Sequence, residues 1–172
     1  GILFIFGRSA RIRMASRFLY RTQTLPAKLE DVYNFFSDPH NLEEITPPFL
    51  NFIILTPRPI EVNKGTIIEY RLSLHGFKLK WVSKISAWNP PYYFIDEQIQ
   101  GPYKSWVHEH IFESSSGKTI VNDKVSYEVP GKFMEPLIHR LFVQPDLMRI
   151  FNYRTETLDQ IWENKARNQN DS

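Results

Sequence analysis

The sequence predicts an α+β fold in which seven antiparallel strands form a curved sheet around one long C-terminal helix. Three observations support this fold class. Between residues 51 and 129, segments with strand-like apolar patterns are separated by short turns containing Gly or Pro, which is typical of antiparallel hairpins. From Lys132 onward the apolar residues recur at helical spacing instead. One further strand and two short helical segments precede the run of strands.

The chain begins its regular structure with a strand over residues 17–25, where side chains of different character alternate. A short amphipathic helix is expected over 27–38, because its apolar residues fall on one helical face. Asp38 and Pro39 suit the N-cap and first position of a second short helix. Pro47 then stops that helix.

Six strands are predicted next, joined by turn sequences such as Lys64-Gly65 and Gly101-Pro102. Their expected limits are residues 51–56, 66–76, 79–88, 92–100, 104–112 and 119–129. In the third of these strands, strict alternation places four residues on one face: Leu79, Trp81, Ile85 and Ala87.

The C-terminal helix is predicted from Lys132, with Pro145 marking a kink or a short break. We expect one domain over residues 17–163, followed by a frayed polar tail at 164–172. Residues 1–16 are expected to be an N-terminal extension to this domain, with Met14 as the natural start; an arm that packs on a neighbouring protein is the alternative.

Composition excludes several classes of protein. The chain of 172 residues has no Cys, so disulfide scaffolds, zinc ribbons, iron–sulfur sites and Cys nucleophiles are excluded. A net charge of +2 without a dense basic stripe predicts no nucleic-acid partner. No apolar run approaches the roughly 20 residues of a membrane span. No phosphate-binding loop is present, so no cofactor is predicted. A cytoplasmic location is expected, and the absence of Cys fits it. The aromatic content of 15% favours an aromatic-lined cavity.

His108 and His110 are the first candidate site residues. Residues two apart on a strand point to the same face, and Trp106 and Phe112 share that face with the histidines. The opposite face carries Val107, so both faces are partly apolar. Periodicity therefore leaves open which face of this strand points inward.

Three interpretations of the histidines are open. A metal ion could take both imidazoles with a carboxylate from Asp96, Glu97 or Asp123, but no spacing fixes that geometry, and no metal site is assigned. One histidine could act as a general base, oriented by Asp96 or Asp123. Alternatively, the histidines line a pocket, where they orient a ligand or join strands by hydrogen bonds.

Asp123 is a second anomaly, because a carboxylate among Val121 and Val125 on an apolar face needs a partner if it is buried. Pairing with a histidine or lysine in a structural network is favoured over catalysis. Arg154 has no predictable orientation on the helix, and a surface salt bridge is its default role. Aromatic residues with polar tips lie on the expected inner faces and fit a ligand cavity together: Tyr70, Trp81, Trp106 and Tyr127.

Four stretches carry a family resemblance: GTIIEY (65–70), FIDEQIQGPYKSWVHEHIF (94–112), VNDKVSYEVP (121–130) and IFNYR (150–154). With the order of elements, they resemble the START/Bet v 1-like superfamily, also called SRPBCC, and within it an uncharacterised ligand-binding subfamily described as polyketide-cyclase-like or "cell division inhibitor"-like. The resemblance implies a helix-grip fold, in which the sheet grips the C-terminal helix over a hydrophobic cavity.

The predicted function is the binding of a hydrophobic or amphipathic small molecule, such as a lipid or a polyketide-like or isoprenoid-like compound. The alternatives are a cyclase- or hydrolase-type enzyme with a cavity histidine as general base, and a protein-interaction module with a vestigial cavity. Catalytic candidates are His108, His110 and Asp123. The residues predicted to bind the ligand are Tyr70, Trp81, Gln98, Trp106, His108, His110, Asp123 and Tyr127.

Overall fold

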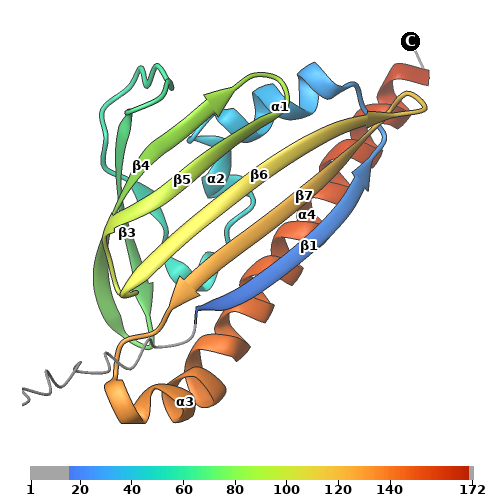
Figure 1. Ribbon diagram of the computed structural model, residues 1–172. Helices are drawn as coiled ribbons and strands as arrows, with labels where there is room; N and C mark the ends of the chain where they lie inside the picture. The colour runs from blue at the N-terminus through green and yellow to red at the C-terminus, as the bar shows by residue number, and fades with distance from the viewer. Residues whose placement is uncertain (1–15, 171–172) are drawn as a thin grey trace, which may run out of the picture.

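The computed structural model describes residues 16–170, so the predicted extension at 1–16 lies almost wholly outside the described residues. The predicted architecture is confirmed. Seven antiparallel strands form one curved sheet, and a long C-terminal helix runs along it (Figure 1). The strand order is β1-β7-β6-β5-β4-β3-β2, so that β1 pairs with the last strand of the chain.

The strands follow the predicted order closely. They are β1 (Arg17–Leu25), β2 (Ile53–Ile54), β3 (Ile67–Leu74), β4 (Phe77–Asn89), β5 (Tyr93–Gln100), β6 (Ser105–Ser115) and β7 (Lys118–Glu128). The strand predicted over 51–56 is the exception, since only two residues pair. A 3-10 turn ends immediately before Asn51, which has a left-handed backbone (φ 44°), and extended structure begins only after it.

The helices are α1 (Leu29–Ser37), α2 (Asn41–Glu44), α3 (Glu135–Ile138) and α4 (Gln144–Asn170), with 3-10 turns η1 (Pro48–Leu50) and η2 (Lys132–Met134) and a π-helical turn η3 (His139–Val143). The π-helical turn ends at Val143, two residues before Pro145, whose missing N–H cannot bond to the preceding turn. α4 continues to Asn170, so the segment expected to be a frayed tail is largely helical.

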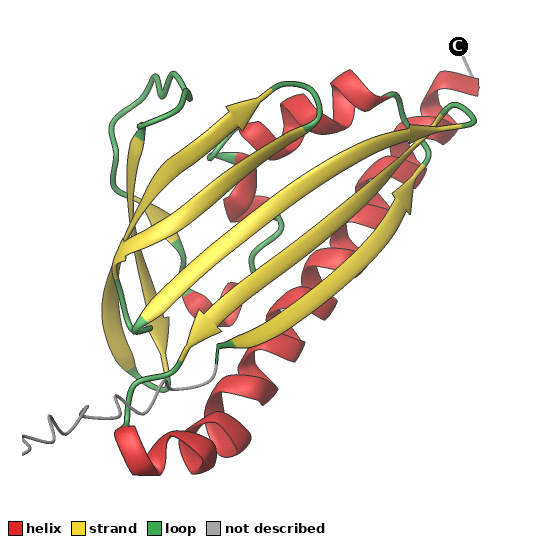
Figure 2. Ribbon diagram, viewed as in Figure 1, coloured by secondary structure: helices red, strands yellow, loops and turns green. Residues whose placement is uncertain are grey.

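The main helices lie on one side of the sheet and enclose a core with it (Figure 2). α1 packs against β6 and β7, and its buried side chains meet those of β5 and α4. Rings dominate this contact: Phe112 lies 5.3 Å from Tyr33 and 5.3 Å from Phe36, measured between ring centroids. None of the helices within residues 16–170 has both the length and the apolar character needed to cross a membrane.

Two register shifts interrupt β4, one between Val82 and Ser83 and one between Ile85 and Ala87. Strict alternation predicts that Ala87 and Trp81 share one face. Because a bulge inserts an extra residue on one strand, it reverses the alternation beyond it. Trp88, rather than Ala87, therefore lines the interior. This part of the sequence prediction is wrong, and local periodicity could not have located the bulge.

Candidate functional site

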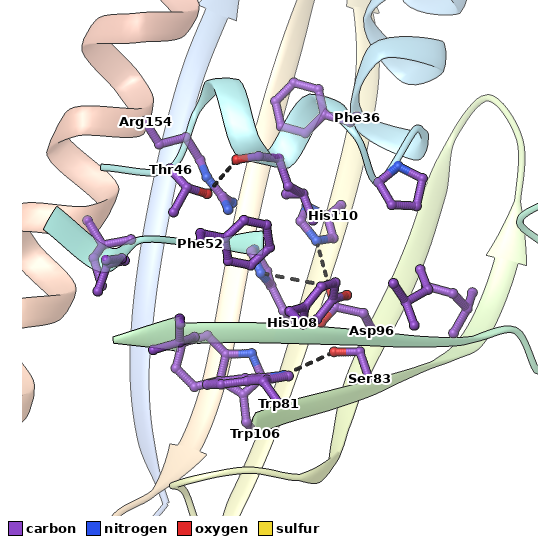
Figure 3. Close-up of a pocket in the computed structure, with 18 of the residues that line it drawn as sticks. Phe36, Thr46, Phe52, Trp81, Ser83, Asp96, Trp106, His108, His110 and Arg154 are labelled. Atoms are coloured by element: carbon purple, nitrogen blue, oxygen red, sulfur yellow. Dashed lines mark hydrogen bonds and ion pairs between the residues drawn. The ribbon is translucent and has the colours of Figure 1, made fainter. Parts of the chain in front are cut away.

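A cavity of about 180 Å³ lies between the sheet and α4 (Figure 3). Its walls come from β3 to β6, from the segment that contains α1, α2 and η1, and from α4. Aromatic rings form much of the lining: Phe36, Phe52, Tyr70, Trp81, Trp88, Phe94, Tyr103, Trp106 and Phe151. Charged side chains and imidazoles are few in the lining: Asp96, His108, His110 and Arg154.

Five of the eight residues predicted to bind a ligand line this cavity: Tyr70, Trp81, Trp106, His108 and His110. The structure also resolves which face of β6 points inward. Trp106, His108, His110 and Phe112 are all buried, whereas Val107 and Ile111 are partly exposed. The helices that cover this side of the sheet decide the orientation, and no pattern within β6 contains that information.

The other three predicted residues lie outside the cavity lining. The side-chain amide of Gln98 donates to the carbonyl of Tyr103 (2.8 Å) and its oxygen accepts from the Tyr103 N–H (3.2 Å), so Gln98 holds the β5–β6 turn. Tyr127 is buried, with its hydroxyl 3.0 Å from Nε2 of His139. Asp123 lies behind the histidines on β7 and reaches the cavity only through them.

Asp123 and Asp96 enclose the two histidines from neighbouring strands. His108 Nε2 donates to Asp123 Oδ1 at 2.8 Å, and His110 Nε2 donates to Asp96 Oδ2 at 3.0 Å. His110 Nδ1 lies 3.0 Å from Asp123 Oδ1, a close ion-pair contact without the alignment of a hydrogen bond. The two imidazole rings lie with their centroids 3.7 Å apart and their planes tilted by 30°, and Phe94 stacks on His110 at 4.3 Å. Antiparallel register produces this cluster, since Asp96 is opposite His108 and Asp123 is opposite His110.

The two histidines differ in charge because their contacts differ. Burial and the nearby charge of His110 lower the pKa of His108, despite its hydrogen bond with Asp123. Burial also opposes charge on His110, but its contacts with Asp123 and Asp96 outweigh burial and raise its pKa. Burial opposes ionisation of Asp123, but the two histidines hold its pKa well below the ordinary value. The two carboxylates thus favour a proton on His110 over one on His108.

Arg154 and Asp96 complete the polar part of the cavity. The pKa of Asp96 is lowered by the histidines and, more weakly, by the charge of Arg154, against the effect of burial. Sequence reasoning named Asp96 only as a possible partner and gave Arg154 a surface role. A signal for Arg154 was present, because it falls at helical spacing between Leu147, Phe151, Leu158 and Trp162 on the buried face of α4.

A metal ion would find its ligands in Asp96, His108 and His110. One ligand atom from each lies within 4.8 Å of the others, and Asp123 would orient the imidazoles from behind. A metal ion would have to displace the proton that His110 shares with Asp96, since a ligating imidazole must be unprotonated. It would also add positive charge near Arg154. The assignment of no metal stays a prediction.

We expect the pKa of His110 to lie above the ordinary histidine value of about 6.5, and the pKa of His108 to lie below it. His110 should keep its proton above that pH and His108 should stay neutral below it, as measured by NMR of imidazole nitrogen-15 shifts. His110 then stabilises the fold fully below about pH 6.5, and this contribution is lost as the pH rises through its folded pKa. His108 stabilises the fold above about pH 6.5, and this contribution is lost as the pH falls. Simultaneous titration of both rings near 6.5 would contradict the assignment.

The sequence matches the family described as "Polyketide cyclase / dehydrase and lipid transport" over residues 25–148. Among curated proteins, no sequence matches this chain. Solved structures with a similar fold include Zhui aromatase/cyclase from a Streptomyces species, with a TM-score of 0.66 and 14% identity over 88% of this chain and 96% of that one. Major latex-like protein 151 from Panax ginseng has a TM-score of 0.63 and 13% identity over 86% and 97%. Protein Ms6760 from Mycobacterium smegmatis has a TM-score of 0.63 and 14% identity over 86% and 92%. These identities are low, so the structural likeness establishes the fold alone.

Proposed function

This chain belongs to the polyketide cyclase / dehydrase and lipid transport family, and from that premise we propose that it binds a hydrophobic or amphipathic small molecule between the sheet and α4. The observation that carries the proposal is the aromatic-lined cavity itself. Aromatic rings line most of this space, and a buried core of side chains from α1, β5, β6, β7 and α4 lies beside it. An apolar ligand in the cavity would be removed from water by this lining and would gain burial energy.

The polar groups of the cavity support ligand orientation. Polar groups fixed by their own contacts can hold one end of a ligand, while the rings cover the rest. His108 and His110 are held in this way by Asp123 and Asp96, and do not need to rearrange when a ligand enters. Tyr70, Trp81 and Trp106 would form the apolar wall beside them.

Catalysis is the second candidate function, because of the geometry of His108. Its Nε2 donates to Asp123, so the neutral ring carries its lone pair on Nδ1. A neutral imidazole oriented by a carboxylate is the arrangement of a general base. A His108→Ala variant that retains ligand affinity but loses turnover of a bound ester, such as p-nitrophenyl decanoate, would favour an enzyme of cyclase or hydrolase type.

We expect the neutral dye N-phenyl-1-naphthylamine to bind the protein and to fluoresce more strongly in the cavity. A Leu72→Trp substitution, which extends a bulky ring from β3 into the cavity, should weaken binding by about tenfold or more, since it removes the space that the dye needs. Fluorescence titration measures both affinities. The matched control is Ile67→Trp on the same strand, where Ile67 is 41% exposed and outside the cavity lining.

The control variant should bind the dye as the unmodified protein does. Equal dye affinity in the Leu72→Trp variant would place the dye elsewhere and remove the support for this function. Circular dichroism of both variants shows whether the sheet has been retained.

A further inference from the structure

We propose that the ligand carries a carboxylate and that Arg154 is the residue that binds it. The inference rests on the proposed function and deepens it, because it assigns a chemical class to the molecule in the cavity. The ligand class is an amphipathic monocarboxylate, with an apolar body among the rings and its acid group at α4.

Arg154 is partly exposed as a residue, but its Nε and Nη1 atoms are buried, and no ion pair forms at its guanidinium among residues 16–170. It lies on the buried stripe of α4 between Phe151 and Leu158, which are 3% and 1% exposed. Figure 3 shows its side chain extending from α4 into the cavity, and it belongs to the cavity lining. Its guanidinium lies over the ring of Phe151, with Cζ 5.1 Å from the ring centroid.

The guanidinium lacks the partners that a buried cation requires. Nε and Nη1 are both buried, and neither has a hydrogen-bond partner among residues 16–170. Buried charges in proteins are normally paired, because a cation removed from water loses its solvation without compensation. The buried N–H groups of Arg154 therefore require a negatively charged acceptor. Because Arg154 lines the cavity, a ligand in the cavity can provide that acceptor.

Asp96 is the carboxylate of the cavity, but it is already engaged. Its Oδ2 accepts from His110 Nε2 at 3.0 Å and lies 4.0 Å from His108 Nδ1. The charge of Arg154 reaches Asp96 only as a weak influence on its pKa, without a direct ion pair. His110 is thus the partner of Asp96 and Asp123, and the guanidinium of Arg154 is available to bind a ligand.

The geometry favours a carboxylate over a neutral acceptor. A planar guanidinium matches a carboxylate in shape, and charge-assisted hydrogen bonds are about twice as strong as neutral ones. The ring of Phe151 covers one face of the guanidinium. The N–H groups of Arg154 lie in the guanidinium plane, so they can donate to a ligand at its edge. The aromatic lining beyond it suits an aliphatic or polycyclic body.

The test compares decanoate, decanol and decylamine, which share one chain length and differ in the head group. Each is titrated against the protein holding N-phenyl-1-naphthylamine, and displacement gives the affinities. Wild type should bind decanoate at least about tenfold more tightly than decanol, since one charge-assisted hydrogen bond at a buried site contributes this much or more. Decylamine should bind most weakly, because its ammonium would face Arg154.

Arg154→Met should abolish the preference for decanoate over decanol. Arg154→Lys should keep part of the preference, because it keeps the charge and loses the planar fork. The matched control is Arg149→Met, which removes an equal charge from an exposed position on α4 and should keep the full preference. The melting temperature of unliganded Arg154→Met should equal or exceed that of wild type, since an unpaired buried cation is removed.

Failure of this inference differs from failure of the proposed function. Equal binding of decanoate and decanol by wild type, with no change in Arg154→Met, would overturn the role of Arg154 and leave a ligand cavity. Binding of none of the three molecules would overturn both. If Arg154→Met kept the preference for decanoate, another residue would bind the carboxylate, and the inference would likewise be overturned.

Discussion

Replacement of Asp123 by asparagine is expected to lower the free energy of unfolding by about 3–5 kcal/mol, because it removes one partner from a buried charge cluster. Asp123 is 8% exposed and is the acceptor for His108 and the close counter-charge for His110. An amide would leave the imidazolium with Asp96 as its one remaining carboxylate. Urea denaturation at pH 7, followed by circular dichroism, measures the loss.

The matched control is Glu109→Gln on the outer face of β6. Glu109 pairs with Lys124 at 3.0 Å, but both side chains are partly exposed, and such pairs contribute about 0–1 kcal/mol. The double variant Asp123→Asn with His110→Asn should lose less than the sum of the two single losses, because residues of one network are not additive. A loss below about 1 kcal/mol for Asp123→Asn would contradict the buried cluster.

The effect of Asp123 should also depend on pH in a defined direction. Its pKa is well below the ordinary value, so its contribution is fully present above the unfolded pKa of about 3.9. As the pH falls through the folded pKa, the carboxylate is protonated and the contribution is lost. The difference in stability between wild type and Asp123→Asn should therefore narrow at acid pH.

Replacement of Phe112 by alanine is expected to cost a similar 3–5 kcal/mol, by leaving a cavity in the packed core. Phe112 is 1% exposed, and its ring meets Tyr33, Phe36 and Phe94. The same urea titration measures the loss. Phe77→Ala is the matched control, since Phe77 is 72% exposed at the β3–β4 hairpin and should change stability by about 0.5 kcal/mol or less.

Similar losses of stability in Phe112→Ala and Phe77→Ala would show that the α1–sheet contact does not stabilise the fold as described.

The cluster around Phe112 also supports the site, because Phe36 and Phe94 contact both Phe112 and the ring of His110. Phe112→Ala should therefore loosen the histidine cluster as well, and the shifted imidazole signals of His110 should move toward those of an ordinary histidine.

Some of the site could be predicted because its information is local. His108 and His110 share a face with Trp106 and Phe112 through the two-residue period of a strand, and all four are buried together. Asp123 on an apolar face predicted a buried partner, and His108 and His110 are its partners. Gln98 is predicted to bind the ligand, but its side chain holds the turn between β5 and β6 and lies outside the cavity lining.

The sequence by itself determined the order of the elements, the antiparallel sheet, the long C-terminal helix and the shared face of the histidines, since all of these follow from short-range periodicity and turn residues. The tertiary structure alone decided which face of β6 points inward, where β4 bulges, and that Asp96 and Arg154 meet the histidines at one cavity. These three features depend on strand register and on helix packing between residues far apart in the chain, so they cannot be predicted from a local sequence pattern.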